Sequence, residues 1–521
     1  MEPQRLYPIG IQTFEKLRTD GYLYVDKTAW VYKLASTSVP CFLSRPRRFG
    51  KSLLLSTFEA YFQGRKDLFR GLAIEKLETR WESYPVFHLD LNAEKYDTED
   101  ALENMLSRNL SLWEGEWGSD VIEKTVAARF AGVLRRACER SGKRVVVLVD
   151  EYDKPLLQSL SDEALQEAYR RTLKAFYGVL KSADRYLRFV FLTGVTKFAQ
   201  VSVFSDLNQL NDISMLKDYA DICGITHDEL LHLFMPDLQM LAAHLGVSLP
   251  ALMEQMERKY DGYRFHPQGS RLFNPFSVLR ALSSKELGDF WFQTGTPTYL
   301  VDLLKGSDYD LRLLTDGVEV KASSFSEYRA DAHNPLPLIY QSGYLTIRSY
   351  DSEVQLYTLG FPNDEVRYGF LNFLVPYYTQ VTDDETGFHI AKFMRELKTG
   401  DVNAFMNRLK IFFAGIPYEL SDNTERHYQA IFHVVFTLLG QYVCSEVHSA
   451  HGRADAVVQT DDTVYAFEFK LNGTAAEALR QIGEKGYLIP YALSGKKLVK
   501  VGVSFSKETR NVEEVSVESV R

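Results

Sequence analysis

Apolar and polar residues alternate in blocks along the first third of the chain. Short, mostly apolar runs stand between charged segments of helical character: Val39–Leu43, Val86–Leu91, Val145–Val149 and Leu187–Leu192. Apolar runs without internal alternation are typical of parallel strands that are buried on both faces. Strands that alternate with helices predict an α/β fold with a doubly wound parallel sheet, in which ligands bind at the carboxyl ends of the strands.

The middle of the chain changes to a helical pattern. From Thr226 to Tyr260, apolar residues recur at helical spacing, which predicts a small helical lid beside the first region. A further helix is expected to begin at Asn274 and Pro275, because asparagine caps helix N-termini and proline suits the first helical turn.

A winged-helix-like pattern follows the lid. Leu336–Tyr340 is expected to form a short helix, and the alternating segments Tyr344–Arg348 and Val354–Leu359 predict a β-hairpin. This order resembles a winged helix, which either binds nucleic acid or a partner, or serves only as a packing module. Asp351 and Glu353 put negative charge at the hairpin tip, where a wing that grips phosphate needs lysine or arginine. The acidic tip favours the packing module.

The last quarter opens with a polar, acidic segment, Thr379–Gly387, which predicts a linker. A helical segment follows over Ala391–Phe413. These boundaries predict three domains: residues 1–225, residues 226–378 and residues 379–521. The length of 521 residues agrees with that number, because a single hydrophobic core rarely serves more than about 250–300 residues.

Two segments near the C-terminus, Arg453–Gln459 and Val464–Lys470, predict a second hairpin that turns at Asp461-Asp462. Such a turn places Asp455 directly opposite Glu468, with their Cβ atoms roughly 4.5–5.5 Å apart. Alternation gives one face the acids, the lysine and small apolar residues: Asp455, Val457, Val464, Ala466, Glu468 and Lys470. The other face is apolar enough to form the core: Ala456, Val458, Tyr465, Phe467 and Phe469.

Composition and charge exclude several classes of protein. The net charge of −9 excludes a wholly basic nucleic-acid binder, so any such contact needs a local patch. The four cysteines are scattered without a C-x-x-C pair, which suggests neither a zinc site nor a disulfide framework. The N-terminus has no apolar core of the signal-peptide type, and Tyr428–Cys444 is short for a membrane span and favours a buried helix. A cytoplasmic protein without membrane contact is expected.

The first candidate site follows the first apolar run, where Arg45–Ser52 has the sequence RPRRFGKS. A strand, a turn and a helix start that end in Gly50, Lys51 and Ser52 suit a triphosphate, because backbone N–H groups, a lysine and a Mg²⁺-binding hydroxyl are then in place. Arg45 stands where a standard loop has its first glycine. Arg47 and Arg48 lie between Pro46 and Phe49. They are either phosphate contacts or solvated loop charges.

Further candidate residues follow the third and fourth apolar runs. Asp150 ends a buried strand and is expected to hold Mg²⁺ opposite the P-loop, and Glu151 to polarise water as a general base. The plain alternative for this acidic pair is a helix cap. Thr193 ends the next run and is either a sensor of the γ-phosphate or an ordinary strand-end threonine.

The second candidate site is the acidic face of the C-terminal hairpin. Opposed like charges destabilise a sheet, and a divalent cation relieves that repulsion. Asp455 and Glu468 are therefore expected to hold Mg²⁺ or Mn²⁺, and Lys470 to orient water or stabilise negative charge during phosphodiester hydrolysis. The alternative is a surface cluster of ion pairs without chemistry.

These segments together resemble the AAA-ATPase-like family of prokaryotic proteins that carry a C-terminal PD-(D/E)XK nuclease-like domain. The blocks that carry the resemblance occur in order along the chain: Ile9–Phe14, Tyr24–Thr28, Arg45–Ser52, Val149–Pro155, Leu192–Lys197, Tyr260–Phe265, Asn274–Ser277, Trp291–Pro297, Tyr340–Thr346 and Gly360–Val366. The D-x(n)-E-x-K spacing of Asp455, Glu468 and Lys470, with Gly452-Arg453-Ala454 before it, resembles the nuclease signature; Ala454 replaces the proline of the superfamily's name.

The resemblance implies ATP binding, with ATP contacts from Arg47, Arg48, Phe49, Gly50, Lys51, Ser52 and Thr193. It makes RPRR the family's own form of the loop. It also implies an acidic metal ligand at Glu425 and catalytic roles for Gln481 and Tyr487. The role of Asp26 and Lys27 stays open: they either line the nucleotide pocket or tie the N-terminal arm to the sheet.

Two functions from different classes remain. The first is an ATPase that controls a metal-dependent nuclease acting on nucleic acid, with DNA favoured over RNA. The second is a nucleotide-switched regulatory or scaffolding ATPase, whose C-terminal domain binds nucleic acid or a protein partner without cleavage. Relatives of this ATPase class act as rings or dimers, so a homo-oligomer is an open alternative under both.

Overall fold

The structure is a computed structural model, and it describes residues 5–37, 39–160, 162–197, 210–292, 300, 314, 317–326, 334–379, 383–414, 425–440, 444–447, 455–471, 473–506, 508–509 and 511–520. The chain divides into two compact units. The first comprises residues 1–309 and 317–366, and the second comprises residues 310–316 and 367–521. This division is coarser than the three domains predicted from the sequence, residues 1–225, 226–378 and 379–521, which remain a prediction.

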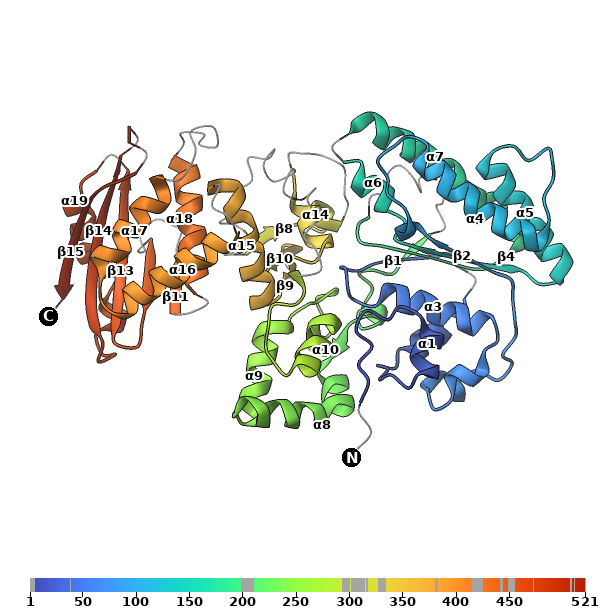
Figure 1. The fold of residues 1–521 in the computed structure, drawn as a ribbon, viewed down its shortest axis with the longest axis horizontal. Helices are drawn as coiled ribbons and strands as arrows, with labels where there is room; N and C mark the ends of the chain where they lie inside the picture. The colour runs from blue at the N-terminus through green and yellow to red at the C-terminus, as the bar shows by residue number, and fades with distance from the viewer. Residues whose placement is uncertain are drawn as a thin grey trace. The chain divides into compact units, whose positions relative to one another are not determined.

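A five-stranded parallel sheet forms the centre of the first unit, in the order β2-β3-β4-β1-β5 (Figure 1). Its strands are β1 (Cys41–Ser44), β2 (Val86–Asp90), β3 (Val145–Asp150), β4 (Leu187–Gly194) and β5 (Asn211–Asp212). The first four coincide with the predicted apolar runs, so the predicted parallel α/β fold is confirmed. The strand between β1 and β3 is β4, whereas β2 lies at the edge beside β3.

Helices cover both faces of this sheet (Figure 1). One face carries α1 (Phe14–Thr19) and α3 (Lys51–Phe62), and the other carries α4 (Ala101–Trp117), α5 (Val126–Ser141) and α7 (Glu163–Ser182). Every residue of β3 is buried. A strand that is covered on both sides needs apolar residues at successive positions, which explains the lack of alternation in the sequence. The shorter helices α2 (Thr28–Ala35) and α6 (Lys154–Gln158) complete this region.

The helices predicted for the lid between Thr226 and Tyr260 are present as α8 (His227–Leu245) and α9 (Leu249–Tyr260), and the further helix predicted at Asn274 is α10 (Pro275–Ser284). These three helices enclose a hydrophobic cluster of their own and are together called the lid below. A capping box of Thr226 and Glu229 begins α8. The Asn274 side chain accepts hydrogen bonds from the N–H groups of Phe276 and Ser277, as expected for the cap of α10.

The predicted short helix and hairpin are also present in the first unit. Helix α14 spans Leu336–Gln341, β9 spans Thr346–Asp351, and β10 spans Leu356–Gly360. The sequence analysis did not predict a third strand, β8 (Val318–Val320), which pairs with β10 in the order β8-β10-β9. A three-residue strand is too short for a pattern of alternation to identify it. A short helix, α13 (Ser323–Ser326), lies between β8 and α14 in the chain.

The second unit combines helices and a sheet. Its helices are α15 (Asp364–Thr379), which begins in the first unit, α16 (Asp383–Lys398), α17 (Val402–Ala414), α18 (Glu425–Leu439) and α19 (Ala475–Lys485). The linker expected at Thr379–Gly387 is wrong for the described residues, because Thr379 ends α15 and α16 begins at Asp383. Residues 383–387 are therefore part of a helix in the structure.

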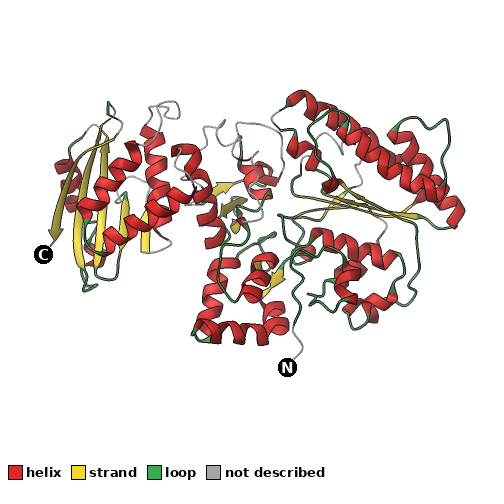
Figure 2. Cartoon of the chain, in the orientation of Figure 1, coloured by secondary structure: helices red, strands yellow, loops and turns green. Residues whose placement is uncertain are grey.

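The sheet of the second unit has the order β11-β12-β13-β14-β15. Its strands are β11 (Cys444–Val447), β12 (Ala456–Gln459), β13 (Thr463–Leu471), β14 (Lys497–Ser506) and β15 (Asn511–Val520). Helix α19 connects β13 to β14, which run parallel, and the other neighbouring pairs are antiparallel. Figure 2 shows the strands of this sheet with helices on both sides.

The hairpin of β12 and β13 has the predicted register. Ala456 pairs with Phe467 and Gln459 pairs with Val464, so the turn is centred on Asp461 and Asp462. The face predicted to be the core packs against residues of α16, α17 and α18. The acidic face is also covered, because Val457, Val464 and Ala466 pack with Ile482 of α19. Arg453 and Ala454, which were expected to begin this strand, lie outside the described residues.

Within the described parts of the chain, no single helix is both long enough and apolar enough to cross a membrane; α8 and α9 meet that test only as a pair bent by 99°.

Candidate functional site

The P-loop connects β1 to α3 at the carboxyl edge of the first sheet. Gly50 caps α3 with φ +91°, a conformation that suits glycine because it has no Cβ atom. Arg48 also has a positive φ, of 67°. The first N–H groups of the 12-residue helix α3 have no partner within the helix and face the loop, so this helix N-terminus favours an anion.

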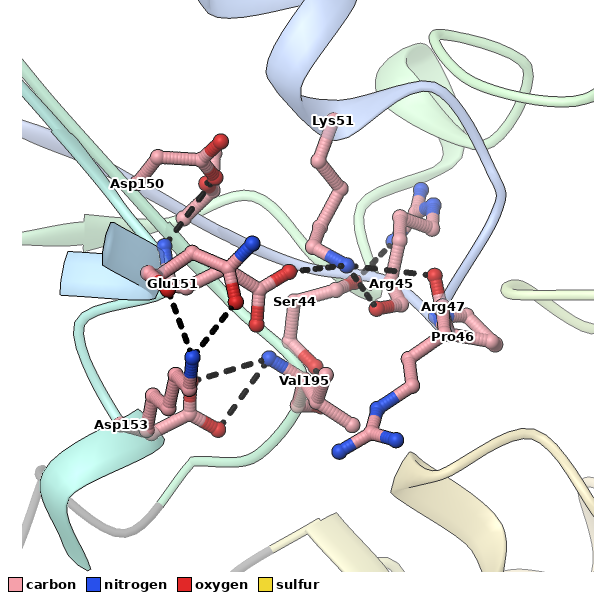
Figure 3. Close-up of polar contacts among 12 residues, drawn as sticks. Ser44, Arg45, Pro46, Arg47, Lys51, Asp150, Glu151, Asp153 and Val195 are labelled. Atoms are coloured by element: carbon pink, nitrogen blue, oxygen red, sulfur yellow. Dashed lines mark hydrogen bonds and ion pairs between the residues drawn. The ribbon is translucent and has the colours of Figure 1, made fainter. Parts of the chain in front are cut away.

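Lys51 spans the P-loop. Its Nζ donates to the carbonyl oxygens of Arg45, at 3.1 Å, and Pro46, at 3.2 Å, and lies 3.3 Å from Oε1 of Glu151. Figure 3 shows this amine between the loop carbonyls and the carboxylate. The Lys51 side chain is only 4% exposed. The buried cation is therefore satisfied by groups that a phosphate chain can replace.

Arg45 braces the loop from beneath. Its guanidinium donates to the carbonyl oxygens of Ser214, at 2.8 Å, and Tyr219, at 2.9 Å, and stacks 4.0 Å from the ring centre of Phe265. The whole side chain is buried. The residue that replaces the first glycine thus has a structural place in the fold, because its charge is met by carbonyl oxygens.

Five of the remaining predicted ATP contacts line one cavity: Arg47, Arg48, Phe49, Gly50 and Ser52. The other, Thr193, is buried and is not among the residues that line this cavity. The guanidinium of Arg48 is exposed and lies 5.2 Å from the ring centre of Phe276 in α10. Phe49 is buried against Tyr263, and so contributes to packing as well as to the cavity wall.

The cavity has a volume of about 970 Å³, which is large enough for a nucleotide. The P-loop and Glu151 form one wall. The N-terminal arm contributes Ile9 and Tyr24, and the lid contributes Phe276 and Leu279. The P-loop contributes charged and polar groups to the lining and the arm and lid contribute several apolar side chains, which together suit a nucleoside triphosphate.

Asp150, Glu151 and Thr193 come together because β3 and β4 are neighbours. The Thr193 hydroxyl donates to Oδ1 of Asp150 at 2.6 Å, and the backbone N–H of Glu151 donates to the same atom at 3.0 Å. Glu151 has φ 52°, which turns its side chain towards Lys51. The hydroxyl of Ser52 and the carboxylate of Asp150 are oxygen donors, the class of ligand that Mg²⁺ takes, so these residues fit that ion.

Sequence reasoning missed Asp153, which is completely buried beside this site. Its Oδ2 accepts hydrogen bonds from the N–H and the hydroxyl of Thr196, both at 2.6 Å, and from the N–H of Val195 at 3.1 Å. Burial and the nearby charge of Glu151 raise the pKa of Asp153. The sequence shows an acid three residues after Asp150, but only the fold shows that it holds the segment after β4.

Asp26 and Lys27 have different places in the structure: Asp26 ties down the N-terminal arm, and Lys27 lines the cavity. Asp26 accepts hydrogen bonds from the N–H groups of Thr28, at 2.9 Å, and Ala73, at 2.7 Å, and so fastens the arm. Lys27 lines the cavity, and its Nζ contacts both carboxylate oxygens of Glu229 in α8 at 2.6 and 2.8 Å. Lys27 therefore joins the arm to the lid beside the cavity.

The second candidate site lies at the end of the β12–β13 hairpin. The N–H of Phe469 donates to Oδ2 of Asp455 at 2.8 Å, which holds that carboxylate next to Glu468. The Nζ of Lys470 lies 3.3 Å from Oε1 of Glu468. The three residues predicted from the D…E-x-K spacing are thus adjacent, as the register requires.

Gln481 and Tyr487 join the same group. Lys470 Nζ donates to Oε1 of Gln481 at 2.5 Å, and the Gln481 amide donates to Oε1 of Glu468 and, at 3.2 Å, to the hydroxyl of Tyr487. Gln481 is on α19, and Tyr487 follows its cap, Gly486. Helix α19 therefore completes the site that the hairpin begins.

Glu468 has a carboxylate oxygen that is suited to bind a cation. Its Oε2 is buried and has no hydrogen-bond partner. Burial, and then the charge of Asp455, raise the pKa of Glu468 to about 7. Burial also raises the pKa of Asp455. A divalent cation relieves both costs, so the pair fits Mg²⁺ or Mn²⁺.

A third ligand is not evident among the described side chains. No group of three or more His, Cys, Asp or Glu residues that could hold a metal ion occurs within that part of the chain. Glu425, the acidic ligand implied by the resemblance, is the first residue of α18, and its side chain lies outside what the structure describes.

Comparisons with known proteins identify two domains in this chain. Residues 8–204 match a family model described as "Predicted AAA-ATPase", and residues 423–515 match one described as "PD-(D/E)XK nuclease superfamily". An "Uncharacterized protein in vnfD 5′region" of Azotobacter chroococcum mcd 1 is 35% identical over 536 residues, which cover 98% of this chain and 99% of that protein. The family resemblance inferred from the motifs is confirmed.

Among solved structures, the Aeropyrum pernix ORC2 protein in its ADPNP and ADP complexes aligns with 64% of this chain and 88% of that chain, at 10% identity and a TM-score of 0.26.

Proposed function

Since this chain belongs to the AAA-ATPase-like family with a C-terminal PD-(D/E)XK nuclease-superfamily domain, we propose that it binds and hydrolyses ATP in the first unit. We propose further that the nucleotide state controls a metal-dependent nuclease site in the second unit. The observation that carries the first part is Lys51, a buried amine held between P-loop carbonyls and Glu151 at the wall of a large cavity.

Each residue of the ATP site has a role in this proposal. The N–H groups at Gly50 and the start of α3 hold phosphate oxygens, and Lys51 exchanges the loop carbonyls and Glu151 for the outer phosphates. Arg47 and Arg48 neutralise phosphate charge. Ser52 and Asp150 would hold Mg²⁺, which neutralises the charge on the phosphates when it is bound.

In this proposal Glu151 activates the attacking water, and Thr193 positions Asp150. Once Lys51 turns to phosphate, Glu151 is released to orient and deprotonate the attacking water. Thr193 fixes the Asp150 carboxylate through the 2.6 Å hydrogen bond. Adenosine occupies the part of the cavity that the arm and the lid line.

In the second unit, Asp455 and Glu468, together with Glu425, would hold Mg²⁺ or Mn²⁺. A divalent ion at this position stabilises charge on the scissile phosphate. Lys470 holds the attacking water or the developing negative charge, and Gln481 and Tyr487 keep Lys470 and Glu468 in register through their hydrogen bonds. The substrate is nucleic acid, with DNA favoured over RNA.

ATP binding is tested by Lys51→Ala. Loss of the amine leaves the outer phosphates without their cation, so we expect the affinity for Mg-ATP to fall at least about tenfold. Equilibrium binding of ATP measures the affinity. Lys66→Ala, at an exposed lysine of the first unit, is the matched control. Unchanged affinity in Lys51→Ala would contradict the assignment of the P-loop.

Nuclease activity is tested with single- and double-stranded DNA and RNA, with Mg²⁺ or Mn²⁺, in the presence and absence of ATP. We expect cleavage by the wild-type chain and a loss of about 100-fold or more in Lys470→Ala and Glu468→Ala. Lys485→Ala, at the end of α19, is the matched control. Absence of cleavage under every condition sinks the nuclease proposal and leaves the ATPase proposal standing.

The second candidate function is a nucleotide-switched regulatory or scaffolding ATPase whose C-terminal domain binds without cutting. One observation favours it: the amine of Lys470 is already held by Glu468 and Gln481, as in a cluster of ion pairs and hydrogen bonds without chemistry. Binding of nucleic acid or a protein without cleavage, together with an ATP-dependent change in assembly state, would support this function. Size-exclusion chromatography with light scattering, with and without ATP, measures that change.

A further inference from the structure

The sequence blocks in the middle region that carry the family resemblance converge on the P-loop within the first unit. None of these blocks has a role in the proposed chemistry: Tyr260–Phe265, Trp291–Pro297, Tyr340–Thr346 and Gly360–Val366. Each has a described residue that contacts the loop, or that holds a residue in contact with it. We refer to Tyr263, Phe265, Trp291, Gly343 and Glu365 as the P-loop bracket.

The first contacts of the bracket are made by rings. The ring centre of Phe49 lies 4.7 Å from that of Tyr263 and 5.6 Å from that of Phe265, in both cases edge to face. The Phe265 ring also supports the guanidinium of Arg45. Arg45 and Phe49, two large residues of the loop, are therefore both packed against one block.

Gly343 makes room for the proline of the loop. It has φ +91°, and a Cβ atom at this position would lie 2.5 Å from Cβ of Pro46, closer than any real contact. The block that contains α14 therefore approaches the loop as closely as a backbone can.

Trp291 provides the hydrogen bond of the bracket. Its indole N–H donates to the carbonyl oxygen of Arg47 at 3.3 Å. The Trp291 ring packs edge to face with Tyr344, at 5.2 Å between ring centres, and is almost completely buried. An indole held in this way is rigid, because neither the ring nor the backbone that carries it is free to move.

Glu365 fixes the backbone of Trp291. One carboxylate oxygen accepts the N–H groups of Phe290, at 2.5 Å, and Trp291, at 2.8 Å, and the other accepts the hydroxyl of Ser277 at 2.7 Å. Glu365 is 1% exposed and is the second residue of α15. A continuous set of contacts therefore runs from the P-loop to the first turn of the helix that leads out of the first unit.

The geometry of the peptide bond gives this contact a consequence for phosphate binding. In a planar trans peptide, the C=O and the following N–H point in opposite directions. Because Trp291 holds the Arg47 oxygen, the N–H of Arg48 is fixed on the side away from the indole. Arg48 lines the cavity, so the indole selects which peptide hydrogen is available to a phosphate oxygen there.

We propose that Trp291 is a positioning residue for phosphate binding: anchored by Glu365, it holds the Arg47–Arg48 peptide of the P-loop in the orientation that accepts a nucleotide triphosphate. This inference rests on the proposed ATP site and adds a residue outside the loop and outside the cavity to it. It also explains why the loop tolerates RPRR, since the bracket supplies the rigidity that a glycine-rich loop obtains from its own turns.

The test compares ATP with adenosine, which lacks the phosphates. In Trp291→Phe, the affinity for Mg-ATP is expected to fall roughly fivefold, the loss typical of one buried hydrogen bond, whereas the affinity for adenosine stays within about twofold of wild type. Glu365→Ala should behave like Trp291→Phe. Glu365→Gln keeps an acceptor for both N–H groups and should restore the wild-type affinity. Trp113→Phe, in α4, is the matched control and should change neither affinity.

Isothermal titration calorimetry measures the affinities, and circular dichroism confirms that each variant is folded. An equal fall in the affinities for ATP and adenosine, or wild-type affinities for both in Trp291→Phe and Glu365→Ala, would overturn the positioning role. Lys51→Ala separates this failure from that of the proposed function. If wild type binds ATP and Lys51→Ala does not, the ATP site stands whatever the bracket variants show; if wild type does not bind ATP, both inferences fall.

Discussion

Arg45 shows how one residue changes the construction of a phosphate loop. A glycine at this position would leave the carbonyl oxygens of Ser214 and Tyr219 without the donors that they have here. Burial lowers the pKa of the Arg45 guanidinium, which measures the cost of removing this cation from water. The hydrogen bonds to the carbonyl oxygens and the contact with the Phe265 ring offset that cost. The same hydrogen bonds connect the loop to the segment that follows β5.

Arg45→Gly brings the loop closer to the standard glycine pattern and is nevertheless expected to be harmful. We expect the free energy of unfolding of the first unit to fall by roughly 3–5 kcal/mol, because buried carbonyl oxygens lose their partners and the side chain leaves a cavity. Urea denaturation measures the change. Arg48→Ala, whose side chain is exposed, is the control and should stay within about 0.5 kcal/mol of wild type.

At the scale of elements, the register of the β12–β13 hairpin was predictable to the residue, because a two-residue turn fixes the register and alternation fixes the faces. The sequence therefore brought Asp455, Glu468 and Lys470 together correctly. It did not reveal that α19 covers the acidic face, because Val457, Val464 and Ala466 are compatible with either a covered or an open face.

Other elements were unpredictable for similar reasons. Strand β8 is too short for a pattern, and the acidic segment after Thr379 has the composition of a loop, although α16 begins within it at Asp383. Asp153, Trp291 and Glu365 lie in blocks that carry the family resemblance, but nothing in the local sequence indicates the contacts that they make. Their positions depend on contacts between residues that are distant in sequence, such as the hydrogen bond between Glu365 and Trp291.

The packing of α19 on β14 depends on Gly502. A Cβ atom there would lie 2.2 Å from the carbonyl oxygen of Ala475 and 2.9 Å from the N–H nitrogen of Leu479. Gly502→Ala should therefore displace α19 and lower the free energy of unfolding of the second unit by roughly 1–3 kcal/mol. Because Gln481 moves with the helix, the proposed nuclease activity should fall as well.

A matched glycine lies in the same helix. A Cβ atom at Gly483 would meet only the end of the Lys500 side chain, at 3.6 Å. Gly483→Ala should raise the free energy of unfolding by roughly 0.5–1 kcal/mol, since alanine favours a helix over glycine. Chemical denaturation measures the free energy of unfolding of Gly502→Ala and Gly483→Ala. Equal values for the two variants would contradict close packing of α19 at Gly502.

At the scale of the whole molecule, the chain contains two compact units with separate hydrophobic cores, and α15 begins in one and continues in the other. Two cores predict two transitions on heating, one for each unit. A change that acts on one core should move one transition and leave the other in place, and Glu365 allows this to be tested with pH.

Burial, with a smaller contribution from the charge of Asp289, raises the pKa of Glu365 from its ordinary value of 4.5 to about 7. Between these values the folded protein holds a proton that the unfolded chain has released, so stability falls as pH rises through this range. The loss amounts to about 3 kcal/mol. The side chain in Glu365→Gln does not titrate. The stability of the first unit of this variant, measured as the difference from wild type at the same pH, should therefore be more favourable at pH 8 than at pH 5.

Differential scanning calorimetry at the two pH values measures this difference. The transition of the second unit should respond to pH alike in wild type and Glu365→Gln, which provides the internal control. A first-unit transition with the same pH dependence in both proteins would show that Glu365 does not change its protonation state on folding.

The core of the second unit reaches beyond the segment that the nuclease family model matches. That segment is residues 423–515, yet Leu371 of α15, Phe393 of α16 and Phe405 of α17 belong to the core that supports the hairpin. A fragment cut at the family boundary would expose those aromatic contacts to water. A fragment that keeps this core intact is therefore expected to start before Leu371 rather than at the start of the matched sequence.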